Sequence, residues 1–574
     1  MSKSSGKIFL FIAGFGAGIT TLIFLVVFII IIAANSSQLI VRPDSYLVID
    51  FEGDIKERPV SDIPDFLAGN NRVMELSKIL ESIKKAAVDQ NIQGLLINGD
   101  LTGYSRTHIE EIGIAIENFK FNNKEVIAWF SRGNNSNYLL SSYADRIYMP
   151  QTASASLSIK GYAMTIPYIG EAFDNIGLDF NVIHSGDFKG TGENYVRSDM
   201  SDNLRSSYKN FLDSYLSIYI DTVSANRNIE SSTIYNLLQE NALIMADANN
   251  AIEYNLIDAT ADYYSLMNVL EGENWKHPVS IYNYSKTLSK TNKQTKIAVL
   301  YIDGTIIDDY SGSSPFNEDY AGAKSIINDI IKIKADDSIK AVVVRINSPG
   351  GSALASEMVH SALNELKKDK PVYTSFGTIS ASGGYYIGCV GDGVFTNRST
   401  LTGSIGVVSI LANYSELSTK LGINFETIKK YSMDDIFSPS RPPSSEEIAL
   451  LRHSMDRIYD EFKFRVTSNR DISEAGINEL AEGRIWTGEQ AVSNRLADLI
   501  GGLYDTIRYA SIQNGIEEYA IVSYPTPPGL WDSVFSGTSM RSNSNIFSDI
   551  LNKLDFYLNN SNTPLFYEVG RVIE

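Results

Sequence analysis

A serine followed by two glycines stands where a strand is expected to give way to a helix, in TISASGGYYIG (Thr378–Gly388). The strand is expected in VYTSFGT (Val372–Thr378), and the helix from about Gly384. A serine at a helix N-terminus lies beside unpaired backbone N–H groups, and glycines let a substrate carbonyl approach the backbone closely. Ser382 is therefore our candidate nucleophile, although the same pattern also fits a serine that only caps its helix.

A second glycine pair, in RINSPGGSALASE (Arg345–Glu357), ends another expected strand. Its turn, Pro349-Gly350-Gly351, can present a second backbone N–H. Two such donors aimed at one point form an oxyanion hole, which stabilises the negative charge that develops in acyl transfer.

A serine nucleophile needs a base, and the histidines fit this role poorly. His453 stands in a helical pattern with a solvated face, and His360 is expected on an ordinary helix surface; His184 is a reserve candidate. A lysine can serve when burial keeps it neutral, which requires its pKa to fall from about 10.4 toward about 7–8. Lys189, in HSGDFKGTGENYVRSDMS, is the candidate, although most lysines are simply surface residues.

The chain alternates short β-branched runs with helical patterns, which is typical of parallel sheets with crossover helices. The run IQGLLIN begins at Ile92, and the run IKAVVVRIN begins 247 positions later, at Ile339. NYLLSSYADRIYM (Asn137–Met149) resembles GYYIGCVGDGVFT (Gly384–Thr396) at the same offset. NIGLDFNVI, from Asn175, resembles KLGINFETI at an offset of 245. We interpret this as a tandem duplication of one α/β unit.

The two halves differ at the candidate catalytic positions. At the common offset Ser382 corresponds to Asn135, and the first half has no Pro-Gly-Gly. Near the position that corresponds to Lys189, the second half has Asp434, in KKYSMDDIF. The nucleophile candidate thus belongs to one half and the lysine candidate to the other, so we expect a composite site between the halves.

Residues 8–34 form an uncharged and almost wholly apolar segment, long enough to span a bilayer as a helix and longer than the apolar core of a cleaved signal peptide. Lys3 and Lys7 precede this segment. The positive-inside rule therefore places the N-terminus in the cytoplasm and the remainder of the chain outside. We expect a retained signal anchor in the lipid bilayer.

The composition limits the classes of function. The 574 residues carry a net charge of −19, which disfavours nucleic acid as a partner. The single cysteine, Cys389, excludes an internal disulfide and a cysteine-based metal cluster, and we expect it to be a small buried hydrophobe. The five histidines show no HxH or HExxH spacing, so neither a metal nor an organic cofactor is implied.

Four motifs together resemble the long, two-domain form of the bacterial signal peptide peptidase A family, a membrane-anchored serine protease. The resemblance covers nearly all of residues 1–525. It implies two tandem crotonase/Clp-protease-like domains after one N-terminal transmembrane helix. The motifs are NSPGG (Asn347–Gly351), SASGGYY (Ser380–Tyr386), STLTGSIGV (Ser399–Val407) and GDFKGTGENYVRSDMS (Gly186–Ser201).

The resemblance also implies roles for single residues. Ser382 and Lys189 correspond to the family's Ser/Lys dyad, in which the serine forms an acyl-enzyme and the lysine is the general base. The backbone N–H groups of Gly351 and Gly383 correspond to the oxyanion hole, and Ser404 to a serine that hydrogen-bonds the lysine. One departure from the family pattern is the pair Gly190 and Gly192 beside Lys189, where a less flexible loop is expected.

The family forms a homotetramer with its sites inside and degrades released signal peptides, so apolar peptides are the expected substrates. The expected location is the bacterial inner membrane, with the catalytic body on the periplasmic side. The expected organisation is a cytoplasmic N-terminus (1–7), a transmembrane signal anchor (8–34), a domain supplying Lys189 (45–290), a domain supplying Ser382 (295–525) and a C-terminal extension without assigned chemistry (526–574).

Three other interpretations remain. A crotonase-type acyl-CoA hydratase or hydrolase predicts a basic patch for the CoA phosphates; no clear patch is seen, and an outward-facing body is on the wrong side for CoA. A non-catalytic scaffold that binds apolar peptides would be favoured by the absence of Ser382 or Lys189, and both are present. A Ser-His-Asp hydrolase of the α/β type has G-x-S-x-G, whereas here Ser380 stands two residues before Ser382.

Overall fold

The computed structural model describes residues 39–50, 54–60, 73–100, 104–272, 277–289, 293–309, 311–313, 319–526 and 565–567. The expected transmembrane segment, residues 8–34, lies outside these ranges. Among the helices that are described, none combines the length and the apolar character needed to cross a bilayer.

The first half is built on a six-stranded parallel sheet. The predicted run IQGLLIN is its strand β4, and every side chain of the neighbouring β1 is buried. A strand covered on both faces contains successive apolar residues, as Leu95, Leu96 and Ile97 show in β4. The order is β11 (His277–Ser280), β1 (Ser45–Ile49), β4 (Ile92–Asn98), β5 (Glu125–Trp129), β7 (Arg146–Met149) and β10 (Ala259–Thr260).

The second half repeats this strand order in a second parallel sheet. The predicted run IKAVVVRIN is its strand β16, at the position that β4 holds in the first sheet. The α/β prediction is therefore confirmed, and the matching order is what a duplicated unit gives. The order is β24 (Ala520–Tyr524), β12 (Lys296–Asp303), β16 (Ile339–Ser348), β18 (Val372–Ala381), β19 (Val394–Thr396) and β23 (Leu499–Ile500); β18 also pairs with β20 (Leu401–Gly403), which pairs with β22 (Ile485–Thr487).

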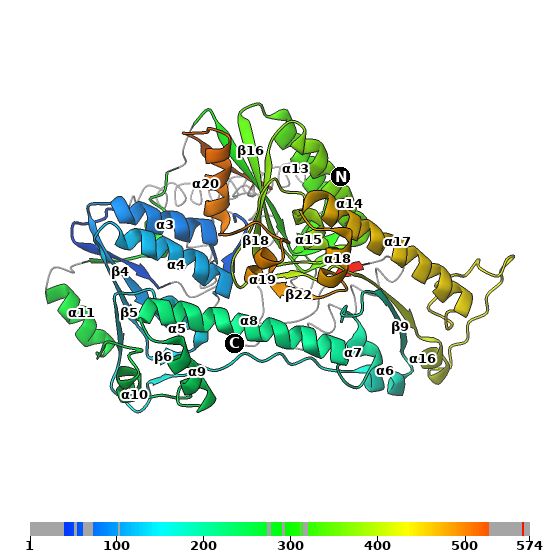
Figure 1. Cartoon of the computed structure of the whole chain (residues 1–574), viewed down its shortest axis with the longest axis horizontal. Helices are drawn as coiled ribbons and strands as arrows, with labels where there is room; N and C mark the ends of the chain where they lie inside the picture. The colour runs from blue at the N-terminus through cyan, green and yellow to red at the C-terminus, as the bar shows by residue number, and fades with distance from the viewer. Residues whose placement is uncertain are drawn as a thin grey trace, which may run out of the picture.

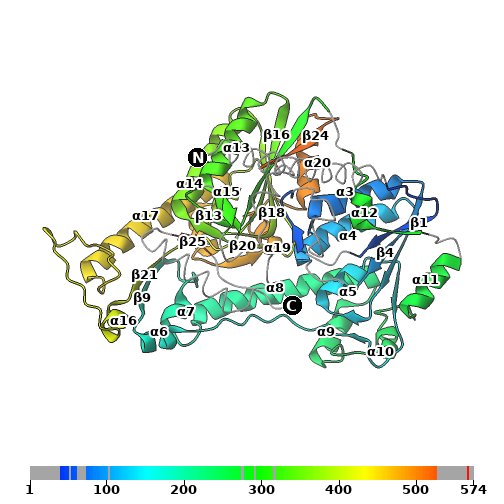
Figure 2. The ribbon, with the colours of Figure 1, turned by 180° about the vertical axis from the view of Figure 1, so that it is seen from behind.

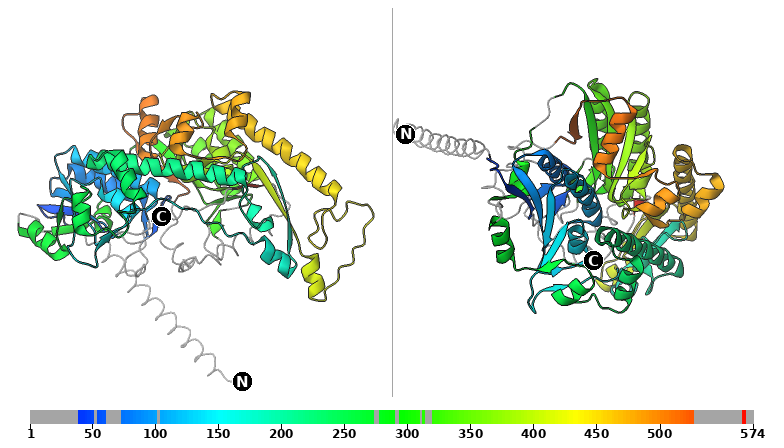
Figure 3. Two further views of the ribbon diagram at one scale, coloured as in Figure 1. Left: turned by 60° about the horizontal axis from the view of Figure 1, so that its bottom comes forward. Right: turned by 60° about the vertical axis from the view of Figure 1, so that its left-hand side comes forward.

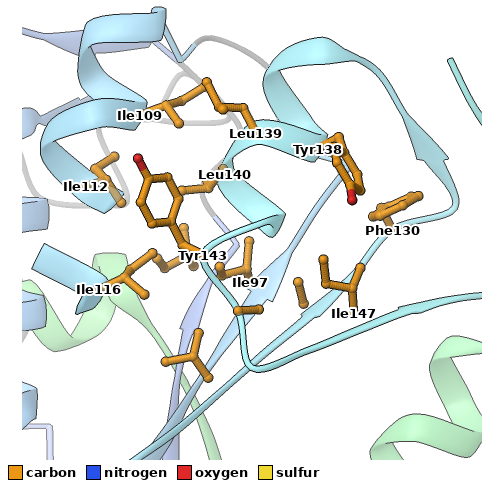
Figure 4. Packing of buried hydrophobic residues seen from close by; sticks show 14 of the residues in the cluster. Ile97, Ile109, Ile112, Ile116, Phe130, Tyr138, Leu139, Leu140, Tyr143 and Ile147 are labelled. Carbon is orange, nitrogen blue, oxygen red and sulfur yellow. The ribbon is translucent and has the colours of Figure 1, made fainter. Parts of the chain in front are cut away.

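Amphipathic helices cover the sheets (Figure 1). On α4, Ile109, Ile112 and Ile116 recur at helical spacing and face Leu139 and Leu140 of α5 in the first core (Figure 4). The helices of the first half are α3 (Leu76–Val88), α4 (Arg106–Lys120), α5 (Asn135–Ser141), α6 (Gly170–Ile176), α7 (Glu193–Val196), α8 (Asp202–Arg227), α9 (Ser231–Gln239), α10 (Ala248–Glu253), α11 (Tyr263–Gly272) and α12 (Ile281–Ser285).

The second half has a hydrophobic core of its own, which its helices surround. Cys389 is fully buried in this core, as predicted. Long α17 and the chain that follows α16 project from the body (Figure 3). These helices are α13 (Ala323–Ala335), α14 (Ala353–Lys367), α15 (Gly383–Gly388), α16 (Ser415–Lys420), α17 (Ser445–Asn469), α18 (Glu474–Leu480), α19 (Gly488–Ser493) and α20 (Leu503–Gln513).

The two halves interlock through a helix and a strand. Helix α8 of the first half runs beneath the second half (Figure 1), where Leu204, Tyr208 and Phe211 pack with Ala381 and Ile485. Strand β9 (Asp179–Ser185) pairs antiparallel with β21 (Val407–Asn413) of the second half. The segment that carries Lys189 follows β9, so this pairing brings the lysine to the second half.

A buried ionic cluster also joins the halves. Arg345 of β16 donates to both carboxylate oxygens of Glu57, at 3.0 and 3.2 Å, and to Glu111 of α4 at 2.7 Å. Burial alone raises the pKa of Glu57, but the charge of Arg345 and a hydrogen bond with His108 outweigh burial and lower it to about 2. Removing one partner of such a buried pair costs about 3–5 kcal/mol of stability, so the cluster holds the halves in one arrangement.

A third sheet contains strands from both halves and from the C-terminal extension. Strand β25 (Leu565–Tyr567) lies between β17 (Gly350–Ser352) and β21, and is seen from behind in Figure 2. It pairs antiparallel with β17, with Phe566 opposite Gly351. From the sequence we assign no chemistry to this extension; in the structure these three residues complete a sheet beside Gly351. The sheet order is β14 (Gly312–Ser313), β15 (Asp319–Gly322), β13 (Thr305–Ile307), β17, β25, β21 and β9; the pairs β2 (Asp54–Lys56) with β3 (Val73–Glu75) and β6 (Arg132–Gly133) with β8 (Ser156–Leu157) stand apart.

The third repeat pair folds differently in the two halves. The first copy, NIGLDFNVI, forms the end of α6 and most of β9. The second copy, at residues 420–428, contains no strand. Phe180 and Ile183 are 6% and 4% exposed, whereas Phe425 and Ile428, 245 positions later, are 51% and 98% exposed. The second copy lacks the strand partner that β21 gives to the first.

Candidate active site

Lys189 and Ser382 meet between the two halves. Lys189 Nζ lies 2.8 Å from Ser382 Oγ, and both side chains are buried, at 2% and 0% exposure. The lysine is not the surface residue that its type alone suggests. The composite arrangement expected from the differences between the halves is present in the geometry.

Ser404 supplies two further contacts to the lysine. Lys189 Nζ lies 2.7 Å from Ser404 Oγ and 3.0 Å from Ser404 O. A neutral amine has two hydrogens and one lone pair. If its hydrogens are donated to Ser404, the lone pair is left for the Ser382 hydroxyl. Burial of this kind favours the neutral form of a lysine.

Ser382 occupies a backbone conformation that is rare for residues with a side chain. Its φ is 53° and its ψ is −114°, at the junction of β18 and α15. Such a conformation costs about 1–3 kcal/mol and persists only when the surroundings hold it. Ser382 N donates to Gly403 O at 2.8 Å, and the serine side chain makes no hydrogen bond that caps α15. The simple capping role is therefore not what the structure shows.

Gly351 and Gly383 lie side by side next to the serine. A Cβ added to Gly383 would stand 3.3 Å from Gly351 N and 2.6 Å from Ser356 Oγ. Gly351 has a φ of +150°, and a Cβ there would stand 2.0 Å from Ile306 O. Only glycine fits at this point, because the backbone of Ile306 lies where a side chain of residue 351 would stand.

The segment Glu482–Arg484 is a part of the site that sequence reasoning missed. Phe188 N donates to Glu482 O at 2.7 Å, next to the lysine, and Ser404 N donates to Arg484 O at 2.7 Å. These contacts are made through the backbone and depend on tertiary folding, so the sequence carries no spacing that could have revealed them.

The histidines fall outside this arrangement. His453 is exposed, as predicted, and exposed His184 has its Nδ1 3.1 Å from Gly186 O. The expectation for His360 is wrong, because its side chain is fully buried, with Nδ1 2.9 Å from Tyr386 O. Burial lowers the pKa of His360 to about 4.

The repeat positions that correspond to Ser382 and Lys189 carry residues with other contacts. Asn135 of the first half, opposite Ser382 in the repeat, exchanges hydrogen bonds with the backbone of Lys160, at 2.7 and 3.1 Å. Asp434 lies in an exposed loop and accepts hydrogen bonds from Lys430 N and Tyr431 N. Across the described residues, no group of three or more acidic, histidine or cysteine side chains is arranged to hold a metal.

Residues 118–276 and 364–517 both match peptidase family S49. The chain belongs to peptidase family S49. One matched region contains Lys189 and the other contains Ser382. The family and its named proteases identify the chain as a serine peptidase, a hydrolase, and confirm the resemblance to signal peptide peptidase A.

Similar proteins extend over most of the chain. It is 29% identical to Protease 4 of Haemophilus influenzae over 451 residues, which are 75% of this chain and 72% of that protein. It is 28% identical to Protease 4 of Salmonella typhi over 512 residues, 85% of this chain and 81% of that protein. A shorter relative, "Putative signal peptide peptidase SppA" of Enterococcus faecium, is 34% identical over 240 residues, 42% of this chain and 70% of that protein.

Proposed function

We propose that this S49 peptidase is a membrane-anchored serine endopeptidase that degrades released signal peptides and similar apolar peptides through a Ser382/Lys189 dyad. The contact of 2.8 Å between Lys189 Nζ and Ser382 Oγ, in a buried site, carries the proposal. It supplies the pairing of nucleophile and base that acyl transfer needs.

In the proposed reaction, neutral Lys189 Nζ accepts the proton of Ser382 as Oγ attacks the peptide carbonyl carbon. The backbone N–H groups of Gly351 and Gly383 stabilise the oxyanion. When the C–N bond breaks, the Lys189 ammonium gives its proton to the leaving amine, and an acyl-serine remains. The lysine then takes a proton from water as the water oxygen attacks the acyl carbon. The bond between this carbon and Ser382 Oγ breaks, the Lys189 ammonium returns the proton to Oγ, and the acid product leaves.

The backbone edge beside Gly351 supports a peptide substrate over an acyl-CoA. The chain's own segment Leu565–Tyr567 pairs antiparallel with Gly350–Ser352. This edge therefore accepts an extended polypeptide backbone, as in strand addition by peptide-binding proteins. The two repeated parallel sheets are consistent with tandem crotonase/Clp-protease-like domains.

Membrane attachment rests on the sequence of residues 8–34. A single uncharged apolar span after Lys3 and Lys7 would anchor the chain in the bacterial inner membrane, with the catalytic body on the periplasmic side. Signal peptides left in the membrane after processing are apolar and would lie close to a peptidase anchored in this way.

Assembly into a homotetramer is supported by a row of exposed apolar side chains in the second half. Ile428 and Phe425 are exposed although their repeat counterparts are buried against β21. Large exposed apolar patches on soluble proteins commonly mark contact surfaces. We therefore place a contact with a second copy of the chain on the row, which consists of Leu421, Ile423, Phe425, Ile428 and Tyr431.

The substrate class is tested with the purified full chain in detergent micelles. An apolar signal-peptide sequence, a charged peptide of the same length and an acyl-CoA thioester are offered separately, and products are identified by mass spectrometry. We expect internal cleavage of the apolar peptide, slow cleavage of the charged one and no thioester turnover. Thioester turnover without peptide cleavage, or peptide cleavage that persists in Ser382→Ala, would contradict the proposal.

A further inference from the structure

Lys189 belongs to the first half of the chain, but its hydrogen-bond partners Ser382 and Ser404 belong to the second half. We propose that Glu482 and Gly483 are positioning residues that fix Lys189 against Ser382 and Ser404. The inference rests on the proposed role of Lys189 as the base. Glu482 and Gly483 lie between α18 and β22 and contact none of the reacting atoms through a hydrogen bond that we find.

Glu482 holds the lysine segment with its backbone and its side chain. Its carbonyl oxygen accepts from Phe188 N at 2.7 Å, and its Oε2 accepts from Asp187 N at 3.1 Å. Two successive amides of the chain that leads to Lys189 are thus bound by one residue. A backbone held at two successive amides has little freedom to tilt the lysine side chain.

The next residues hold the other side of the site. Arg484 O accepts from Ser404 N at 2.7 Å, and Gly483 N donates to Ile405 O at 2.8 Å. The Arg484 guanidinium lies 3.4 Å from the centre of the Phe188 ring, which adds a cation–π contact to the lysine segment. One short stretch therefore fixes Lys189 and its partner Ser404 relative to each other.

Gly483 lets this stretch come into direct contact with the lysine backbone. Its φ is +80°, and a Cβ there would stand 2.5 Å from Lys189 N and 2.6 Å from Lys189 Cα. Both of these atoms belong to the backbone and cannot turn aside. Any side chain at position 483 must therefore displace the backbone of Lys189, unless the stretch Glu482–Arg484, which we call the brace, moves instead.

A tyrosine of α17 anchors Glu482 in turn. Tyr459 OH donates to Glu482 Oε1 at 2.9 Å and accepts from Glu482 N at 3.0 Å. On the same helix, Asp456 accepts from Ser185 Oγ of β9 at 2.8 Å. Helix α17 thus supports both Glu482 and the strand that precedes the lysine segment, so the brace rests on a rigid element.

The brace compensates for the flexibility that the glycines beside Lys189 suggest. Gly190 and Gly192 give the segment little stiffness of its own. Stiffness is supplied from outside, by Glu482, Gly483 and Arg484. A displacement of about 1 Å in a catalytic group can lower the rate about 100-fold. Loss of the brace should therefore reduce turnover more than substrate binding.

The test compares the full chain with two pairs of variants. Gly483→Ala is paired with Gly515→Ala, which also has a positive φ, of +61°, but has open space around its Cβ position. Glu482→Ala is paired with Glu479→Ala, an exposed glutamate on α18. Glu482→Gln keeps one acceptor oxygen and serves as the conservative variant. Turnover, KM and the pH dependence of peptide cleavage are measured, together with Tm.

We expect kcat to fall about 100-fold in Gly483→Ala and at least about 10-fold in Glu482→Ala, with KM within about twofold of the parent. The rise of activity with pH should move to higher pH, because a displaced lysine regains contact with solvent, which favours its charged form. Glu482→Gln should recover part of the loss. The paired control variants should keep parental activity and pH dependence.

Parental kcat and pH dependence in both Glu482→Ala and Gly483→Ala would overturn the brace while leaving the dyad intact. If Gly483→Ala fails to fold, the glutamate variants decide alone. An inactive parent, or full activity in Lys189→Ala, would instead overturn the proposed function. A fall in Tm without a change in the pH dependence would assign these residues a purely structural role and would also overturn the inference.

Discussion

At the scale of single residues, burial decides which form each titratable group takes. His360, in α14 two turns after the Pro-Gly-Gly segment, is fully buried, and its Nε2 finds no hydrogen-bond partner among the described residues. Its charged neighbours are Glu357, Lys367 and Arg465. Burial dominates over them and lowers its pKa from 6.5 to about 4. The folded protein therefore keeps this imidazole neutral where the unfolded chain would protonate it.

A pH dependence of stability follows for His360. The stabilising contribution is complete above about pH 6.5 and is lost as the pH falls toward 4, by up to about 3 kcal/mol. In His360→Asn, which keeps a donor for Tyr386 O, Tm should fall less over this range than in the parent. The measurement is calorimetry at several pH values, with His453→Asn as the exposed control. Equal slopes in parent and His360→Asn would refute the prediction.

The sequence predicts the site residues that stand in a recognisable local motif, but not those whose role depends on tertiary contacts. Ser382 was found because a hydroxyl before two glycines at a strand–helix junction is a local pattern. Lys189 was found because the halves differ there, and Ser404 only through the family resemblance. Glu482 stands alone in its segment, and its role depends on contacts almost 300 positions away in sequence. His360 was misjudged because a helix covered on several sides shows the same spacing as a surface helix.

At the scale of elements, the third sheet places strand β17 at the site, with a partner strand on each side. Strand β17 carries Gly351, and β25 of the C-terminal extension pairs with it and with β21. A strand in this place satisfies backbone groups on both sides. A substrate that binds Gly350–Ser352 in extended form must therefore displace β25.

Removing the extension should relieve this competition. A chain ending at Thr526 should show a lower KM for the apolar peptide, with kcat within about twofold of the full chain, because Ser382, Lys189 and their supports remain. Steady-state kinetics of the two chains, with matched Tm values, makes the comparison. A higher KM in the shortened chain would show instead that β25 helps to form the substrate site.

The central elements were predictable because their patterns are strong. β4 and β16 contain unbroken apolar stretches, Leu95–Ile97 and Ala341–Val344, as expected of strands covered on both faces. The segment at residues 420–428 shares the apolar pattern of β9 but forms no strand. A strand also needs a partner, and among the described residues this copy pairs with none. Apolar side chains such as Phe425 and Ile428 then remain exposed until another surface covers them.

At the scale of the whole molecule, the duplication produces one composite site from two units. Each unit keeps its own parallel sheet, while α8, β9 and the Arg345 cluster join the units. Ser382 and Lys189, the proposed nucleophile and base, then meet only when both halves are folded and docked. Sequence comparison of the halves predicted this composite site, but the docking itself depends on contacts between distant residues.

The proposed assembly depends on the exposed row of the second half. Ile428→Asp places a charge at its most exposed position and should convert the homotetramer to smaller species, with Tm almost unchanged. Ile512→Asp, at an exposed isoleucine on α20, is the control and should leave the assembly intact. Native mass spectrometry in detergent measures the mass. A tetramer that persists in Ile428→Asp would exclude this surface as the contact.

The proposed activity depends most on the contact between Lys189 and Ser382 across the two halves, which one experiment tests directly. Cleavage of an apolar fluorogenic peptide is compared in the full chain, Ser382→Ala, Lys189→Ala and His184→Ala, with Tm as the check of folding. We predict losses of about 1,000-fold or more in the serine and lysine variants and parental activity in the histidine variant. Retained activity in Lys189→Ala, or its loss in His184→Ala, would contradict the composite site and assign the base elsewhere.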